Sequence, residues 1–70
     1  MLTVVEYDIL EQAITKGTRL ALRRRGSEFL VIPERLRIAS GREVIHARHP
    51  STGHFFELFV DELESIEVVR

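Results

Sequence analysis

Apolar and polar positions change their period along the chain, from helical spacing at the start to strand alternation afterwards. The helical spacing predicts a helix over residues 6–16, and the Gly that follows suits the left-handed residue that ends a helix. The spacing of Asp8 and Glu11 resembles a capping box, with Asp in the place of Ser or Thr. Thr3 and Glu6 have the same spacing and offer a second, earlier start.

From residue 18 onward, Val, Ile, Leu and Phe alternate with polar residues between Gly, Pro and Ser, which is typical of short antiparallel strands. We expect strands over residues 18–25, 27–32, 34–39, 43–49, 54–60 and 64–69. The two-residue turn Arg25-Gly26 pairs Leu22 with Phe29 and Leu20 with Val31, and we expect these residues on the core side. Pro33 cannot donate a ladder hydrogen bond, so the strand ends, bulges or lies at an edge there.

The clearest hairpin joins residues 43–49 to residues 54–60 through a loop of four turn-forming residues. That loop length places His49 opposite His54 and fixes all the other cross-strand pairs. One face of this hairpin then belongs to the core. Its residues are Ile45, Ala47, Phe56, Leu58 and Val60. The other face mixes charged, aromatic and aliphatic side chains. Its residues are Val44, His46, Arg48, Phe55, Glu57 and Phe59.

One N-terminal helix followed by five or six short antiparallel strands predicts a mainly β domain over residues 1–70. A strongly bent meander of this size removes its exposed edges by closing, so we expect a small SH3-like or Sm-like barrel with the helix across one end. A chain of 70 residues buries only about 60% of its unfolded surface, so oligomerisation would help to stabilise it.

The composition limits the class of protein and the compartment that we expect. There is no Cys, which excludes disulfides and thiolate metal sites and suits the reducing cytoplasm, where we expect the protein. The apolar share of 44% and charged share of 30% are ordinary for a globular domain. No apolar run approaches the roughly 20 residues that a membrane span needs, and we expect no membrane partner.

The net charge of −1 hides an uneven distribution. Residues 1–15 carry −3 and residues 49–70 carry −4, whereas residues 16–48 hold nine Lys or Arg against three Glu. Three consecutive arginines at a hairpin end could bind phosphate, and four more extend the basic segment. They are Arg23, Arg24 and Arg25, followed by Arg35, Arg37, Arg42 and Arg48. Arg48 faces Phe55 across the hairpin, where a cation–π pair could form and bases could stack.

The three histidines do not form a convincing metal or catalytic site. His49 and His54 are neighbours, but His46 points to the opposite face, and a zinc site needs three or four ligands close together. His46 opposite Glu57 could be an oriented base, yet no Ser or Thr is placed as its nucleophile and there is no Cys. We therefore expect no enzyme activity, no metal and no cofactor.

The outward phenylalanines of the hairpin have two interpretations. Phe55 and Phe59 are covered by another element, or they form an exposed apolar patch that marks a partner. A partner would be another protein or a second copy of this chain, which would make a homo-oligomer.

Two stretches carry a resemblance to Rof, a family of small bacterial proteins with an Sm-like barrel behind an N-terminal helix. Residues 7–13 resemble the Rof motif Tyr-Asp-x-Leu-Glu-x-Ala, and residues 57–65 resemble its closing Glu-Leu-x-Leu-Asp-x-Ile-x-Ser. Rof proteins bind the transcription terminator Rho and hinder its loading onto RNA. The resemblance implies that Asp8 and Glu11 belong to an acidic surface facing basic Rho.

A weaker resemblance is to the WYL domain, an Sm-like barrel of bacterial regulators. Residues 32–36 and 58–63 are similar to its Pro-x-x-Leu and Phe-x-Leu-Asp-Arg-Ile runs. The Trp-Tyr-Leu that names the domain is Glu43-Val44-Ile45 here, and Glu62 stands where its ligand-binding Arg would be.

These features predict a non-enzymatic domain that acts by binding a macromolecule. The first hypothesis is protein binding of the Rof kind, which modulates Rho-dependent termination. Its contact residues would be Asp8, Glu11, Val44, His46, Phe55, Glu57 and Phe59. The alternative is an RNA- or DNA-binding barrel of the Sm-like or WYL-like kind, with single-stranded RNA as one ligand. Its contact residues would be Arg23, Arg24, Arg25 and Arg48.

Overall fold

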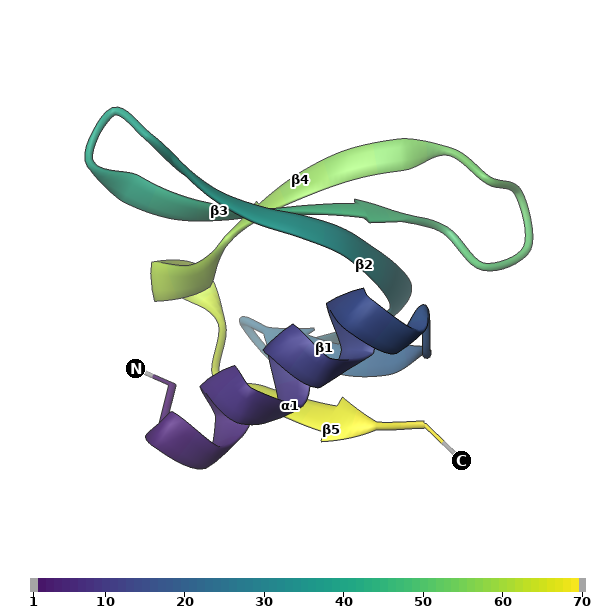
Figure 1. Ribbon diagram of the computed structural model, residues 1–70, viewed down its shortest axis with the longest axis horizontal. Helices are drawn as coiled ribbons and strands as arrows, with labels where there is room; N and C mark the ends of the chain where they lie inside the picture. The colour runs from purple at the N-terminus through teal and green to yellow at the C-terminus, as the bar shows by residue number, and fades with distance from the viewer. Residues whose placement is uncertain (1, 70) are drawn as a thin grey trace.

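The computed structural model describes residues 2–69; Met1 and Arg70, which complete the predicted domain, lie outside the described residues. One helix precedes five strands, and a short 3₁₀ helix separates the last two (Figure 1). In chain order the elements are α1 (Val4–Lys16), β1 (Leu20–Arg24), β2 (Ser27–Ala39), β3 (Arg42–Arg48), β4 (Phe55–Phe59), η1 (Val60–Glu62) and β5 (Ser65–Val68).

A single long strand bends the sheet. Residues 27–39, predicted as two strands, form the continuous strand β2, which pairs with β1 through its first part and with β3 through its second. The register shifts between Pro33 and Arg35, so of the three alternatives for Pro33 the bulge is the one that occurs. A bulge leaves a residue out of the ladder, which suits a proline that has no N–H, and it bends the strand.

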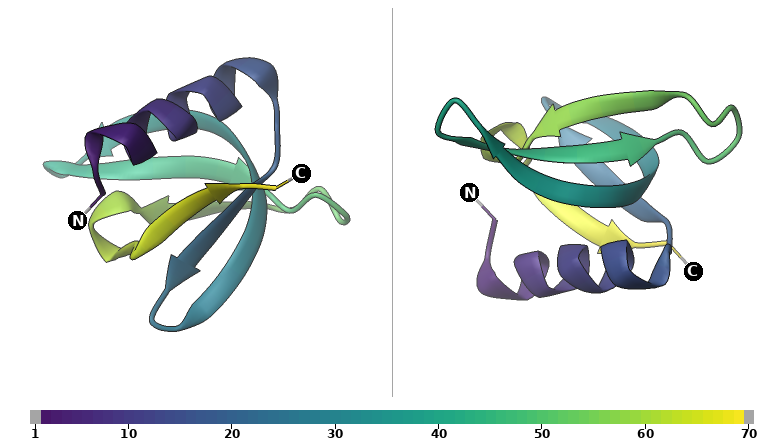
Figure 2. Two further views of the ribbon diagram at one scale, coloured as in Figure 1. Left: turned by 90° about the horizontal axis from the view of Figure 1, so that it is seen from below. Right: turned by 45° about the horizontal axis from the view of Figure 1, so that its top comes forward.

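The five strands follow the order β4-β3-β2-β1-β5, and all neighbours are antiparallel. The mainly β fold with one N-terminal helix is therefore confirmed. Within residues 2–69 no ladder joins β4 to β5, so a closed SH3-like or Sm-like barrel is not confirmed. Instead β2, β3 and β4 form one layer, while α1 lies on the other side, against β2 and β5 (Figure 2).

The predicted hairpin registers are confirmed. Val44 pairs with Phe59 and Arg48 with Phe55 in the β3–β4 ladder, and the His49 amide donates to the His54 carbonyl at 2.8 Å. Leu22 pairs with Phe29 in the β1–β2 ladder. Because side chains alternate along each strand, these registers fix which residues face α1 and which face away.

The core lies between α1 and the bent sheet. Most of the strand residues predicted for it are buried, and α1 adds two more buried side chains, Leu10 and Ala13. The buried predicted residues are Leu20, Leu22, Val31, Ile45, Ala47, Leu58 and Val60. Phe29 and Phe56, also predicted as core, are only partly buried and pack against it.

The helix starts earlier than its predicted first residue because the second capping box is the one that forms. The Thr3 hydroxyl accepts from the Glu6 amide at 3.1 Å, and the Glu6 carboxylate accepts from the Thr3 amide at 2.9 Å. Asp8 therefore lies inside the helix and does not cap it. Gly17 ends the helix at φ 70°, a left-handed conformation that glycine adopts readily.

Glu6 also ties the helix to the sheet, since its other carboxylate oxygen accepts from the Ile66 amide at 3.0 Å. Hydrogen bonds from the Thr3 and Ile66 amides lower the pKa of Glu6. A carboxylate whose pKa is lowered by folding stabilises the fold above its ordinary pKa, and this contribution is lost as the pH falls through the lowered value.

Acidification from pH 7 to about pH 3 is therefore expected to lower the melting temperature of the wild type more than that of Glu6→Gln. The glutamine keeps the size of the side chain but has no charge to titrate. Thermal melts followed by circular dichroism across this range measure the difference. Parallel pH profiles for the two proteins would show that Glu6 does not link pH to stability.

No helix within the described residues is both long enough and apolar enough to cross a membrane.

Candidate nucleic-acid interface

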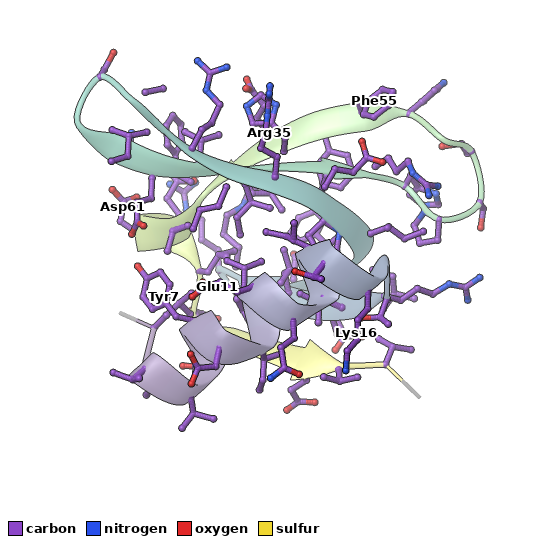
Figure 3. All side chains as sticks on the ribbon, viewed as in Figure 1. Tyr7, Glu11, Lys16, Arg35, Phe55 and Asp61 are labelled. Carbon is purple, nitrogen blue, oxygen red and sulfur yellow. The ribbon has the colours of Figure 1, made fainter. Side chains whose placement is uncertain are left out.

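Basic and aromatic side chains gather on the surface of the β2–β3–β4 layer that points away from α1. We call it the outer face and define it by Arg35, Arg37, His46, Arg48, Phe55 and Phe59. Arg35, His46 and Glu57 occupy one cross-strand row. Figure 3 shows Arg35 and Phe55 on the side of the sheet away from α1, whereas Glu11 and Lys16 lie on the helix.

The two phenylalanines of the outer face differ. Phe55 is 73% exposed, so its ring is accessible. Phe59 is half-buried, and the Arg42 guanidinium lies 3.6 Å from its ring centroid. Of the two interpretations of this pair, the exposed patch applies to Phe55 and covering applies to Phe59. The predicted stacking of Arg48 on Phe55 does not appear among the cation–π contacts of residues 2–69.

The arginines of this region divide into paired and unpaired groups. Arg48 Nε donates to Glu34 at 3.0 Å, and Arg42 binds both oxygens of Asp61 at 2.6 and 2.9 Å. Arg35 and Arg37 are exposed, and neither makes an ion pair within the part of the chain that the structure describes. These two side chains therefore carry the available positive charge of the outer face.

A shallow hollow of about 360 Å³ lies beside the exposed ring. Its lining residues are His46, Ala47, Phe55, Phe56 and Glu57. His46 Nε2 lies 3.0 Å from a Glu57 oxygen, but the two are not aligned as a hydrogen bond, and this nitrogen is buried without any other hydrogen-bond partner in residues 2–69. The exposed Glu57 carboxylate can therefore accept a hydrogen bond from a base edge, whereas the buried His46 nitrogen is out of a ligand's reach.

The three consecutive arginines do not join this face. Arg23 lies 3.7 Å from Glu28 and Arg24 lies 3.6 Å from Glu62, so two of the three are balanced by carboxylates. Ser27 pairs with Arg24 and Ile32 with Arg48, which places Arg48 about 16 Å further along β2. Arg25 is exposed in the turn. The four residues predicted to bind nucleic acid therefore do not form one surface.

The residues predicted to bind protein also separate. Asp8 and Glu11 are exposed on α1, and the hairpin residues lie on the outer face, on the other side of the sheet. The prediction that Val44 contacts a partner is wrong. Val44 lies between Arg37 and Phe59 in the ladders and is only 3% exposed, so it has almost no surface to offer. His46, Phe55, Glu57 and Phe59 do lie together. A homo-oligomer built on Phe55 stays a prediction.

His49, at the start of the hairpin loop, has a structural role. The His49 ring nitrogen Nδ1 accepts from the amides of Ser51 and Thr52, at 3.1 and 3.3 Å. It therefore satisfies the loop backbone instead of pointing a lone pair at a metal. The residues described contain no group of three or more His, Asp or Glu side chains placed to hold a metal ion.

Sequence reasoning did not separate Arg35 and Arg37 from the other arginines. Their alternation with Leu36 and Ile38 was the available signal, since it places both on one face of a strand. Which face became clear only from the pairing of Arg35 with His46 and of Arg37 with Val44.

No protein-family model matches this chain, and no curated protein matches it. Among solved structures, the proteasome accessory factor B/C (PafBC) of Arthrobacter aurescens matches with a TM-score of 0.77 and 23% sequence identity. The match covers 97% of this chain but only 12% of PafBC, so it compares one small part of that protein. At this identity the likeness shows a shared fold alone, and it does not support the Rof resemblance specifically.

Proposed function

We propose that the chain is a non-enzymatic domain that binds single-stranded nucleic acid on its outer face, in a regulatory setting. The observation that carries this proposal is that the exposed Phe55 ring and the unpaired Arg35 and Arg37 share one sheet surface. Surfaces that bind single strands combine aromatic rings, on which bases stack, with cations that follow the backbone. The resemblance of the sequence to the WYL domain supports the regulatory setting, because that domain occurs in bacterial regulators.

A single strand fits this surface better than a duplex. The face is one side of a three-stranded layer, and the described residues place no helix on it that could enter a major groove. An unstacked base can instead lie on Phe55, with its edge toward the hollow formed with His46 and Glu57. The phosphates on one side of that base would then meet Arg35 and, one row further along the sheet, Arg37.

The experiment measures the affinity for a labelled oligonucleotide of about 12 nucleotides at several salt concentrations. Each phosphate contact on a single strand contributes roughly −0.7 to the slope of log K against log salt. We expect Arg35→Gln and Arg37→Gln each to reduce the slope by about that amount. Fluorescence anisotropy with oligo(dT) and oligo(U) gives the slopes directly.

Arg25→Gln is the matched control, because Arg25 is an exposed arginine in the β1–β2 turn, outside the outer face. It should leave the slope unchanged. If Arg25→Gln reduces the slope and the Arg35 and Arg37 variants do not, the interface is the arginine turn. A wild type that binds neither oligonucleotide at low salt would end the proposal.

Protein binding of the Rof kind is a second proposal, supported by the exposure of Asp8 and Glu11 on α1. Glu11→Lys tests it. Because Glu11 does not cap the helix, reversing the charge of this side chain is expected to leave the fold intact. The variant should bind Rho more weakly than the wild type if this surface contacts a basic partner, chiefly through a slower association rate. Oligonucleotide affinity should stay the same or rise slightly.

A further inference from the structure

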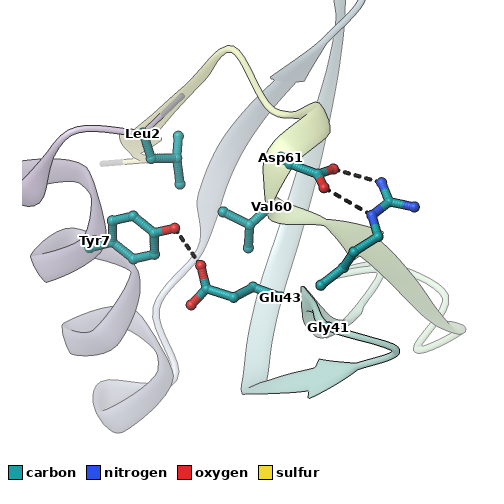
Figure 4. A pocket seen from close by; sticks show the side chains of 7 residues that line it. Leu2, Tyr7, Gly41, Glu43, Val60 and Asp61 are labelled. Carbon is teal, nitrogen blue, oxygen red and sulfur yellow. Dashed lines mark hydrogen bonds and ion pairs between the residues drawn. The ribbon is translucent and has the colours of Figure 1, made fainter.

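A second cleft, of about 400 Å³, opens between α1, the β2–β3 turn and η1. Figure 4 shows its walls, with Tyr7 from the helix facing Glu43 from β3. Its lining residues are Leu2, Tyr7, Gly41, Arg42, Glu43, Val60 and Asp61. None of them lines the hollow beside Phe55, and the volume is in the range of small-molecule sites.

The polar centre of this cleft is a tyrosine–carboxylate pair. The Tyr7 hydroxyl donates to Glu43 Oε1 at 2.5 Å, which joins the helix to a strand 36 residues away. This hydrogen bond, together with burial and the charge of the carboxylate, raises the pKa of Tyr7. Tyr7 therefore keeps its proton at neutral pH and orients Glu43. Within residues 2–69, Glu43 Oε2 accepts no hydrogen bond and Glu43 makes no ion pair.

The cation of the cleft is already occupied. Arg42 donates through Nε and one terminal nitrogen to both oxygens of Asp61, and the same terminal nitrogen lies 3.5 Å from Glu62. Asp61 has a pKa lowered by this hydrogen bonding, so it stays charged and holds Arg42 in place. Two carboxylates, Glu43 and Asp61, line the cleft with one guanidinium, that of Arg42. Because Asp61 is paired with Arg42, the unmatched negative charge of the cleft is at Glu43.

The rest of the wall is apolar. Leu2 and Val60 are almost fully buried, and the Tyr7 ring stands beside them (Figure 4). An alkyl chain can pack on the partly exposed Tyr7 ring, over the small accessible parts of Leu2 and Val60, while its charged end stays at the polar centre, as long basic side chains do on protein surfaces.

We propose that this cleft binds an alkyl ammonium or alkyl guanidinium group. The cation donates to Glu43 Oε2, and the alkyl chain lies mainly against the Tyr7 ring. Anionic ligands are disfavoured, because Arg42 is held by Asp61 and no other cation among residues 2–69 lines the cleft. This inference is independent of nucleic-acid binding, since it concerns other residues and the opposite charge.

The test titrates ¹⁵N-labelled protein with agmatine and cadaverine, and separately with the blocked tripeptide Gly-Lys-Gly. Saturable shifts are expected at the amides of Tyr7, Gly41 and Val60. The free amines and the tripeptide distinguish a small molecule from a side chain of a partner as the source of the cation. n-Pentanol, which has the chain without the charge, should bind at least about tenfold more weakly.

Glu43→Gln removes the charge but keeps an acceptor for the Tyr7 hydroxyl. It should weaken cadaverine binding by about tenfold or more, the value of a hydrogen bond to a charged group. Glu67→Gln, an exposed carboxylate on β5, is the matched control and should bind like the wild type. Equal affinity of Glu43→Gln and wild type would overturn the proposal. If that variant does not fold, equal binding of cadaverine and n-pentanol to the wild type would overturn it just as well.

Discussion

Leu58→Ala is expected to destabilise the domain by about 2–5 kcal/mol. Leu58 is 3% exposed on β4 and pairs with Ile45, which is completely buried. The substitution removes buried methyl groups and leaves a cavity that the surrounding strands can close only partly. A domain of 70 residues has a total stability of about 4–10 kcal/mol, so a large share of it would be lost. Urea unfolding followed by circular dichroism measures the change in the free energy of unfolding.

Phe55→Ala is the matched comparison for stability, because Phe55 lies on the same strand but points to the other side. Its 73% exposure predicts a change within about 0.5 kcal/mol. A shift of the ladder by one residue would exchange the two faces. Equal destabilisation by the two substitutions would therefore contradict the observed β3–β4 register.

The same Phe55→Ala substitution is expected to have a large effect on nucleic-acid binding. Removing an aromatic ring on which a base stacks costs about 1–3 kcal/mol, which is roughly a 5- to 150-fold loss of affinity. Phe55→Trp should keep or strengthen binding, since every aromatic ring offers a stacking surface. Fluorescence anisotropy with oligo(dT) at low salt measures both variants.

Ile38→Ala is the control for this binding prediction. Ile38 is a large apolar residue, 70% exposed, near the β2–β3 turn. It should leave oligonucleotide affinity unchanged, because it lies off the outer face and carries no ring. Equal losses from Ile38→Ala and Phe55→Ala would show that exposed apolar area, and not base stacking, drives binding.

The β3–β4 hairpin could be predicted from local chemistry. Four turn-forming residues set the loop length, and the loop length sets the register of every following pair. The alternation of residues then assigned Ile45 and Leu58 to the core, as observed. Each of these inferences needs only neighbours that are close in sequence.

The continuity of β2 and the start of α1 were harder to predict from the sequence. In the sequence Pro33 indicates the end of a strand, because it cannot donate a ladder hydrogen bond. In the structure the strand continues through a bulge at this position, where β2 pairs with β3. The helix is capped by Thr3 and not by Asp8, because Glu6, the partner of Thr3 in the capping box, also accepts a hydrogen bond from the Ile66 amide. That amide is 60 residues away, so no local pattern reports it.

The functional surfaces were predicted only in part. His46, Phe55 and Glu57 were correctly placed on one face, because strand alternation alone decides this. Val44 was wrongly expected to be available, since its burial depends on neighbours from β2 and β4. The arginine runs could not be ranked from sequence, because pairing with carboxylates from other elements decides which cations remain available.

The sequence by itself determined the order of the elements, the hairpin registers and the split of each strand into a core side and an outer side. Those properties follow from residue periodicity and turn chemistry, which act over a few residues. The tertiary structure decided which charges are balanced, as for Arg42 with Asp61, and which groups meet across a cleft, as for Tyr7 with Glu43. Both depend on how far-apart segments come together when the sheet bends at the β2 bulge, and that geometry is set by packing of the whole chain.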